Sequence, residues 1–373
     1  MKNIVLTGAT GYLGAQLLRA LVEHFQVENI YLLTSRREGK DVLLKLDINS
    51  GHRAHAGNGF VSLQESTLQP ADITKTVEEI DTAFECELAG ALEWEAPKVF
   101  YPDALTRWEW WLKHNRNLRL SFLSTTSVAG RRRGLFTEFD LECRQSFHNG
   151  WELACYEAER LLKGSELASR ITVFRPSIMI GDSHTGAIYK FPPFYEVLRL
   201  LRHPRNLISG DAKARIDIVP VDYVAEAVLA ITAQSETEGK TYHLVSGWEQ
   251  SMSLRDFAEL VRSHDRAHHF RVRIVPPVAR PFARAVNRLN VGSHWSQDNS
   301  LTSSFEGCLT HPAVFDDYMA RGVLEPKGMS CPPIQAYVSQ TINFAETHHW
   351  LSEPRIMTEL TKVASNVTPQ TFA

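Results

Sequence analysis

The first 25 residues constrain the fold of this chain more than any other stretch. Residues 4–6 are a short apolar run, and residues 7–14 follow it as Thr-Gly-Ala-Thr-Gly-Tyr-Leu-Gly. Between Leu13 and Phe25 the apolar residues recur at helical spacing. A strand, a glycine turn and a helix in this order are typical of a phosphate-binding turn that opens a parallel α/β sheet.

Each glycine suits such a turn. Gly8 allows a tight exit from the strand, Gly11 lets the backbone approach a pyrophosphate, and Gly14 allows the helix to pack closely on the strand. The alternative is a glycine turn with only a structural role. We expect a dinucleotide to contact a set of residues around the turn: Gly8, Thr10, Gly11, Tyr12, Leu13 and Gly14.

The end of the second predicted strand, residues 30–33, selects the cofactor. An acidic residue there would hold the ribose 2′-hydroxyl of NAD, whereas Ser35 and Arg36 would pair with a 2′-phosphate. We therefore predict NADP rather than NAD. The alternative is that Arg36 and Arg37 are exposed loop charges.

Composition limits the classes of partner. A net charge of −3 gives no reason to expect nucleic acid, and no apolar run approaches the ~18 residues of a membrane span. The five cysteines are odd in number and widely spread, without a metal-ligand spacing. This cysteine pattern predicts a reduced, metal-free protein. The first strand begins without a charged leader, which favours the cytoplasm.

The turn spacing Gly-x-x-Gly-x-x-Gly resembles the extended branch of the short-chain dehydrogenase/reductase superfamily. Later stretches are similar to its thioester-reductase-like group, which includes the male-sterility-type fatty acyl reductases and acts on carrier-bound or CoA-bound acyl groups. The matching stretches are residues 122–130, 134–138, 147–149, 157–161, 175–183 and 218–224.

This resemblance implies a doubly wound parallel Rossmann sheet with a smaller, mostly helical C-terminal cap that binds substrate. The dinucleotide-binding domain would comprise residues 1–177 and 212–246, and the cap residues 178–211 and 247–351. Residues 352–373 would form a flexible tail. After the fourth strand of the sheet, the family usually carries a motif of small residues. Here that stretch contains Glu85 and Glu87, whose charges would repel a bound phosphate.

The resemblance places Thr125 where a hydroxyl bonds the substrate carbonyl, and Pro176 and Ser177 beside the nicotinamide. The family's catalytic Tyr-x-x-x-Lys falls on Trp151 and Cys155. Tyr156 and Arg160 form a similar pair five residues further on. That shift rotates them by about 140° and moves them about 7.5 Å along a helix, away from the same nicotinamide.

The replacements remove specific chemistry. The tyrosine donates a proton as hydride arrives, and the lysine lowers the tyrosine pKa. Tryptophan has an N–H donor without an acidic proton, and neutral cysteine has no positive charge. Cys155 has two alternative roles, a packing cysteine and a nucleophile. The packing role is favoured, because the nearby Glu152 and Glu159 would raise the pKa of the thiol. His148 reads as a loop hydrogen-bonding residue.

Three functions follow. The first is an NADP-dependent oxidoreductase acting on a hydrophobic acyl, thioester or ketone substrate through Thr125. The second is a reductase-derived protein that binds a ligand or partner without redox turnover. The third is a non-redox enzyme that reuses the pocket for condensation, cyclisation or isomerisation. A homodimer is compatible with all three.

Overall fold

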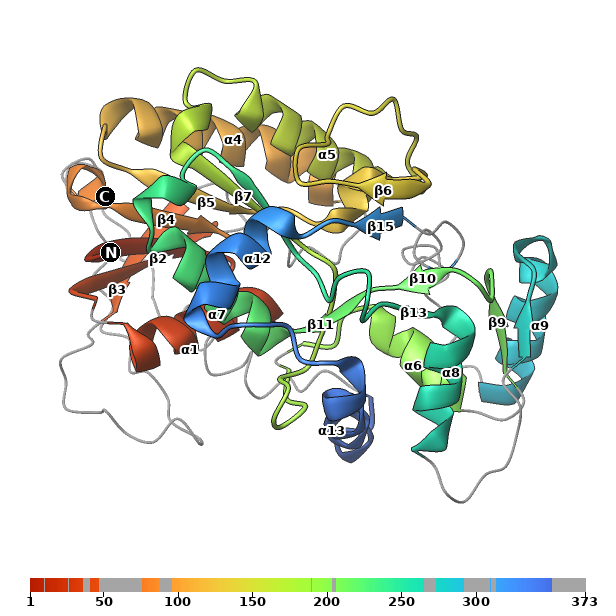
Figure 1. Ribbon diagram of the computed structural model, residues 1–373. Coiled ribbons are helices and arrows are strands. Elements are labelled where there is room, and N and C mark those ends of the chain that lie inside the picture. Colours follow the sequence, from red (N-terminus) through yellow and green to blue (C-terminus); the bar gives the residue numbers. More distant parts are fainter. Residues whose placement is uncertain are drawn as a thin grey trace, which may run out of the picture.

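The computed structural model describes residues 1–9, 11–25, 27–35, 41–46, 76–87, 96–188, 190–202, 206–264, 273–291, 309 and 313–350. Within them a seven-stranded sheet has the order β12-β7-β5-β4-β1-β2-β3 (Figure 1). The strands are β1 (Asn3–Thr7), β2 (Asn29–Ser35), β3 (Asp41–Leu46), β4 (Thr82–Glu85), β5 (Arg119–Leu123), β7 (Ile171–Pro176) and β12 (Thr241–Leu244). The Rossmann-type α/β fold is confirmed.

One edge of the sheet differs from a wholly parallel arrangement. β2 pairs with β3 in antiparallel register, with Ile30 opposite Leu46, whereas the other neighbours run parallel. The short connection after β2 explains this, because a parallel return requires a crossover of a dozen or more residues. The sequence also predicts a strand at the apolar residues 60–63, which lie outside the described part of the chain.

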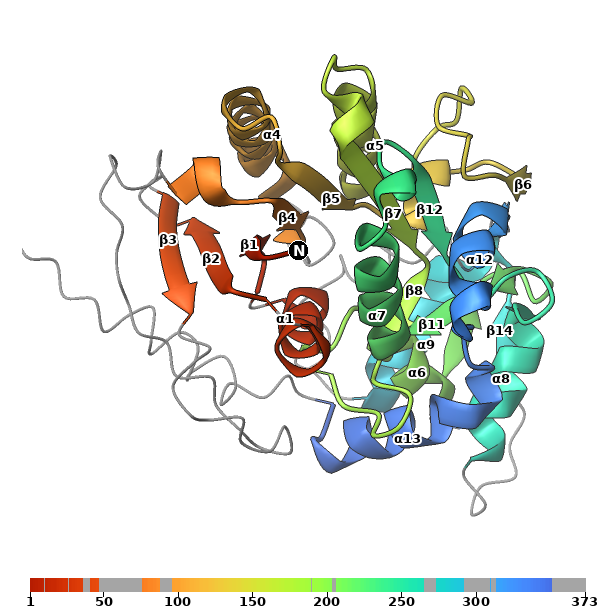
Figure 2. The ribbon, with the colours of Figure 1, turned by 60° about the vertical axis from the view of Figure 1, so that its left-hand side comes forward.

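Helices cover both faces of the sheet (Figure 2). The side chains of β1 alternate, so that Ile4 and Leu6 join one core cluster and Val5 joins the other. Helices α1 (Tyr12–His24) and α7 (Val221–Thr232) lie on the first face. On the second face are α4 (Ala96–His114) and α5 (Gly150–Lys163).

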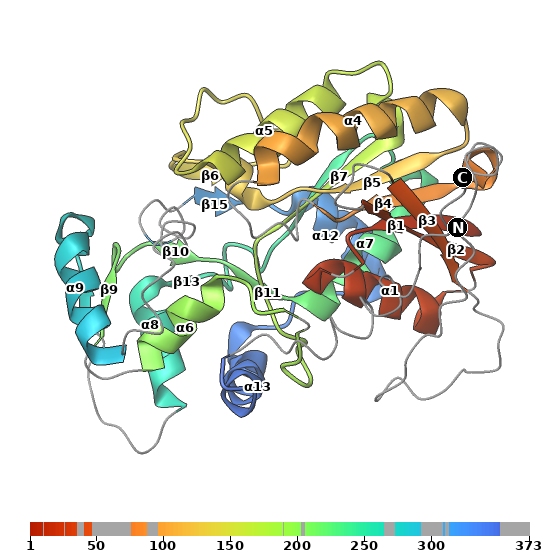
Figure 3. The same ribbon diagram turned by 180° about the vertical axis from the view of Figure 1, so that it is seen from behind.

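The remaining elements gather at the carboxyl ends of the parallel strands, far from β1 to β3 (Figure 3). The cap combines helices with two-stranded ladders: β8 with β11, β9 with β14, β10 with β13 and β6 with β15. Its helices are α6 (Phe194–Arg202), α8 (Leu254–Ser263), α9 (Arg280–Val291) and α13 (Ile334–Thr347), whereas α12 (Tyr318–Leu324) packs against β12 and α7.

The short strands are β6 (Gly134–Phe136), β8 (Ile178–Ile180), β9 (Leu207–Ser209), β10 (Arg215–Ile216), β11 (Ile218–Pro220), β13 (Met252–Ser253), β14 (Arg273–Val275) and β15 (Ala313–Phe315). The 3₁₀ turns are η1 (Thr126–Ala129), η2 (Ala168–Arg170), η3 (Ser235–Thr237), η4 (Pro277–Ala279) and η6 (Glu325–Lys327). The expected return of residues 212–246 agrees with α7 on the sheet and β12 within it, while the domain boundaries stay a prediction.

Two further expectations from the sequence concern membrane spans and the C-terminal tail. No described helix has both the length and the apolar character that crossing a bilayer requires. The expected tail, residues 352–373, lies outside the described part of the chain.

Candidate active site

The glycine turn has the compact geometry that its spacing predicts. Gly8 has φ +64°, and the N–H of Gly11 donates to the carbonyl oxygen of Gly8 at 2.8 Å. A Cβ atom on Gly14 would lie 2.1 Å from that same oxygen, and one on Gly8 would lie 2.8 Å from the backbone of Cys86. Any larger residue at either position would therefore disrupt the turn.

The start of α1 suits an anion. Its N-cap is Gly11, which has no side chain to occupy the space in front of the first turn. Tyr12 and Leu13 are buried as the first residues of the helix. Thr10 and Arg36 lie outside the described residues, and only the backbone of Ser35 is described, as the end of β2.

The two acidic residues after β4 have partners. Glu85 is 3% exposed, and its Oε2 accepts a hydrogen bond from Nε1 of Trp108 at 2.5 Å. The guanidinium of Arg107 lies 3.7 Å from the carboxylate of Glu85 and 3.8 Å from that of Glu87. Because the arginine offsets one of these two negative charges, the expected repulsion of a dinucleotide phosphate is weaker than the sequence suggested.

Thr125 follows β5 and caps η1. Its Oγ1 accepts a hydrogen bond from the N–H of Ser127 at 3.1 Å, and the residue is 7% exposed. The hydroxyl hydrogen of Thr125 therefore points elsewhere and is available to a carbonyl oxygen. The preceding residue is fixed as well, since Oγ of Ser124 donates to Oε2 of Glu159 at 3.0 Å.

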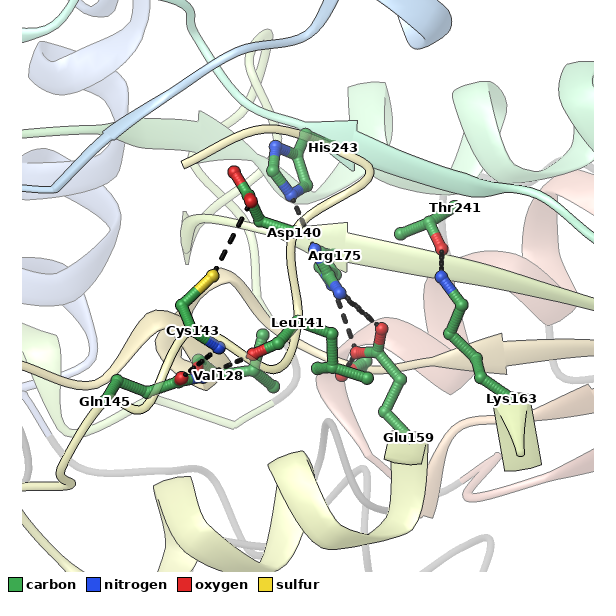
Figure 4. A network of polar contacts seen from close by, with 11 residues as sticks. Val128, Asp140, Leu141, Cys143, Gln145, Glu159, Lys163, Arg175, Thr241 and His243 are labelled. Carbon is green, nitrogen blue, oxygen red and sulfur yellow. Dashed lines mark hydrogen bonds and ion pairs between the residues drawn. The ribbon is translucent and has the colours of Figure 1, made fainter. Parts of the chain in front are cut away.

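A closed polar network lies behind this loop (Figure 4). Arg175 on β7 donates to both carboxylate oxygens of Glu159 on α5, and its Nη1 donates to Nε2 of His243 on β12 at 3.1 Å. Nδ1 of His243 donates to the carbonyl oxygen of Asp316 at 2.6 Å. Burial and the adjacent Arg175 lower the pKa of His243 to about 3, so the imidazole is neutral.

Trp151 and Cys155 lie on the inner side of α5. Nε1 of Trp151 is buried and has no hydrogen-bond partner among the described residues, and Cys155 is fully buried. Burial raises the pKa of Tyr12, the first residue of α1, and the Cys155 thiol adds to that shift.

The alternative pair on α5 has a different environment. Tyr156 packs against Phe147, with ring centroids 5.1 Å apart, and Arg160 forms a partly exposed ion pair with Glu157 at 2.7 Å. Neither residue lines the cavity described next. Trp151 and Cys155 do not line it either, so the choice between the two pairs stays a prediction.

A cavity of about 50 Å³ lies beside the ends of β5 and β7. It adjoins the expected site, because Thr126 follows Thr125, Glu152 follows Trp151, and Ser177 was itself predicted. Its lining comes from η1, α5 and the segments around β8, β10 and β15: Thr126, Ser127, Ala129, Gly130, Glu152, Ser177, Ile178, Arg215, Asp217, Ala313 and Phe315.

Of the lining residues only Ser177 was predicted as a site residue, and the charged ones that were missed are Glu152, Arg215 and Asp217. Asp217 is buried, which raises its pKa, and its Oδ1 accepts a hydrogen bond from the N–H of Ser246 at 2.9 Å. Arg215 stacks on Trp248, with its guanidinium carbon 4.3 Å from the ring centroid. These residues meet at the cavity only because the chain after β7 folds back onto the sheet, and no local motif signals that contact. Pro176 ends β7 and is buried beside Ser177.

The comparisons with known proteins agree with this geometry. Residues 107–228 match the family described as male sterility protein, and residues 3–102 match the semialdehyde dehydrogenase NAD-binding domain. The terminal R domain of the myxalamid PKS-NRPS pathway superposes with a TM-score of 0.70 at 22% identity, over 94% of this chain and 92% of that one. The resemblance to the thioester-reductase-like group of extended short-chain dehydrogenases/reductases is confirmed.

Other relatives point the same way. The R domain of a nonribosomal peptide synthetase from Mycobacterium tuberculosis has a TM-score of 0.66 at 16% identity, over 94% of this chain and 93% of that one. A carboxylic acid reductase from Mycobacterium tuberculosis is 23% identical over 307 residues, which are 70% of this chain. This chain spans 26% of that reductase and 6% of the hybrid PKS-NRPS synthetase fsa1 from Fusarium sp., which is also 23% identical over 70% of this chain.

Proposed function

We propose that this chain is an NADP-dependent oxidoreductase that reduces a hydrophobic acyl thioester or ketone. The observation that carries the proposal is the position of the hydroxyl-lined cavity. It lies at the carboxyl ends of β5 and β7, in the same parallel sheet as the strand that leads into the glycine turn. Ligands of doubly wound sheets bind at these strand ends. The carboxylic acid reductase and the R domains among the relatives support a carrier-bound or CoA-bound acyl substrate.

The cofactor would be held by backbone more than by side chains. Gly8, Gly11, Gly14 and the first N–H groups of α1 fit a pyrophosphate, and Ser35 and Arg36 would bind the 2′-phosphate that distinguishes NADP from NAD. Thr10, Tyr12 and Leu13 would complete the turn, with Pro176 and Ser177 bordering the nicotinamide. When bound, the cofactor would supply a hydride to the carbonyl carbon of the substrate.

The chain's own residues would orient that carbonyl. Thr125 accepts the N–H of Ser127, so its O–H hydrogen can bond the carbonyl oxygen. The indole N–H of Trp151 can donate a second hydrogen bond, because it has no other described partner. Neither group gives up a proton at neutral pH, which makes the site divergent from one built on tyrosine and lysine.

A direct test compares NADPH and NADH binding, followed by hydride transfer to acyl thioesters and ketones. We expect tighter binding of NADPH and slow reduction, with Thr125→Ser active and Thr125→Ala impaired about 10²- to 10³-fold. Absence of binding would overturn the proposal.

A second function has one specific observation in its favour. Trp151 and the fully buried Cys155 replace the proton-donating pair, which fits a protein that binds a ligand or partner without redox turnover. NADPH binding without hydride transfer would favour that function. Turnover without cofactor consumption would favour a non-redox reaction. The homodimer and the cytoplasmic location stay predictions.

A further inference from the structure

His148 and Glu152 form a buried acid–base pair at the start of α5. Nδ1 of His148 lies 3.0 Å from Oε2 and 3.2 Å from Oε1 of Glu152. The His148 side chain is 1% exposed and that of Glu152 is 5% exposed. Glu152 follows Trp151 directly and lines the cavity together with Thr126 and Ser177.

Part of this arrangement is a helix cap. The side chain of Asn149 accepts the N–H of Glu152, and Oε2 of Glu152 accepts the backbone N–H of His148 at 2.8 Å. Reciprocal bonds of this kind stabilise helix N-termini, and a glutamine makes them equally well. Capping therefore explains neither a carboxylate at the cavity wall nor an imidazole buried against it.

The chemistry of the site leaves one requirement unmet. After a hydride adds to a carbonyl carbon, the carbonyl oxygen needs a proton, and neither Trp151 nor Thr125 is an acid near neutral pH. A histidine coupled to a carboxylate is a proton carrier in this pH range. The pair is one residue from the position where the family's proton donor is expected.

We propose that the His148–Glu152 pair donates the proton in the reduction, in place of the tyrosine that Trp151 replaces. The inference rests on the proposed reductase function. As hydride adds to the carbonyl carbon, the π electron pair of the C=O bond moves to oxygen. The Nδ1 proton of the imidazolium passes to the Glu152 carboxylate and from there to that oxygen. The pair is left as neutral imidazole and carboxylate, and solvent restores the proton.

Other charged groups face the same space. Arg215 and Asp217 line the cavity with Glu152, and Nε of Arg131 donates to the carbonyl oxygen of Phe147, next to His148. Their charges differ in sign and stay in place when Glu152 is made neutral. A change in the pH profile caused by Glu152→Gln alone therefore reports on the pair.

The decisive variant is Glu152→Gln, which keeps an oxygen acceptor for the N–H of His148 and removes the proton carrier. We expect kcat to fall about 10²- to 10⁴-fold with little change in KM, because that range is typical for loss of a general acid. The unaltered protein should show a kcat that decreases toward high pH, and this decrease should vanish in Glu152→Gln. Glu157→Gln, on the same helix in a partly exposed ion pair, is the matched control and should keep full activity.

A second readout separates proton donation from binding. The solvent deuterium isotope effect on single-turnover hydride transfer should change in Glu152→Gln and stay unchanged in Glu157→Gln, while both variants bind NADPH as the unaltered chain does. An unchanged isotope effect in Glu152→Gln, or full activity of Glu152→Gln while the unaltered protein reduces substrate, overturns the proton-donor role alone. If the unaltered protein reduces no thioester or ketone, the reductase function fails and this role fails with it.

Discussion

Helix α5 carries two buried acid–base pairs, and their surroundings are opposite. Glu159 is enclosed with Arg175, and Ser124 and His243 complete its network without any member lining the cavity (Figure 4). Glu152 lies two turns before Glu159 on the same helix. It is paired with His148, which precedes the helix, and it lines the cavity. One pair is a closed structural network, and the other borders the small cavity at the ends of β5 and β7.

The difference teaches how one helix serves both stability and chemistry. A buried ion pair is costly to break because the remaining charge is left unpaired. Arg175 and Glu159 use this to hold β7, β5 and β12 in place behind Thr125. A pair at a cavity wall can instead exchange a proton with a ligand. Substitutions in the first pair should change stability, and substitutions in the second should change activity.

The largest expected effect comes from breaking the closed pair. Arg175→Met leaves the Glu159 carboxylate buried without its cation, so the free energy of unfolding should fall by about 3 to 5 kcal/mol. Urea unfolding measures this loss. The double variant Glu159→Leu with Arg175→Met should be less damaging than Arg175→Met alone, and a loss below about 1 kcal/mol for the single variant would contradict a structural role.

The next effect is pH-dependent and tests the neutral His243. Its folded pKa is about 3, whereas an unfolded histidine titrates near roughly 6.5. As pH falls from about 7 to about 5, the unfolded chain takes up a proton that the folded chain refuses. The histidine contribution to stability therefore falls by about 2 kcal/mol.

The variant His243→Gln isolates this contribution. Burial raises the pKa of Glu138 to about 7, so the folded protein gains stability from that residue in the same pH range, and this masks the histidine in the unaltered chain. Because Glu138 is present in both proteins, its effect cancels in their difference. The stability gap in urea unfolding should shrink by about 2 kcal/mol at the lower pH; a constant gap would mean that His243 is not held neutral.

A smaller effect concerns the open end of α5. Trp151→Tyr restores an acidic hydroxyl at the expected donor position and should raise the rate of hydride transfer about 10-fold, equivalent to about 1.4 kcal/mol. Stopped-flow absorbance of the reduced nicotinamide measures the rate, and Trp151→Phe is the control without a hydroxyl. Equal rates for the two variants would show that residue 151 does not face the substrate.

The smallest effect is expected at the outer pair. Tyr156→Phe and Arg160→Ala should leave turnover unchanged and cost at most about 0.5 kcal/mol, since Arg160 forms a partly exposed ion pair with Glu157. Steady-state kinetics and urea unfolding measure both quantities. A large loss of turnover in either variant would move the catalytic pair to these residues.

The sequence predicted the backbone parts of the molecule well. The strand, turn and helix around Gly8 to Gly14 follow from local spacing, because a Cβ at Gly14 has no room in such a turn. The strand ending at Leu123 and the helix that carries Trp151 were likewise expected. Local patterns suffice there because each element is defined by residues near one another in sequence.

Long-range partners were not predictable in the same way. Arg107 offsets one of the two charges of Glu85 and Glu87 from a different element, which no spacing rule signals. Arg215 and Asp217 meet Glu152 only through the folded cap. The antiparallel pairing of β3 depends on how few residues separate it from β2 rather than on the composition of either strand. The cofactor-binding and catalytic roles stay predictions.

The most direct test of the central claim is a single-turnover experiment with NADPH and a hydrophobic acyl thioester. The reduced nicotinamide would be followed by its absorbance in the unaltered protein and in Gly14→Ala, whose added Cβ would meet the oxygen of Gly8. We predict slow, stoichiometric oxidation of NADPH with formation of the reduced acyl product, and no reaction in Gly14→Ala. NADPH that stays unoxidised by the unaltered, folded protein with every thioester and ketone tried would contradict the claim.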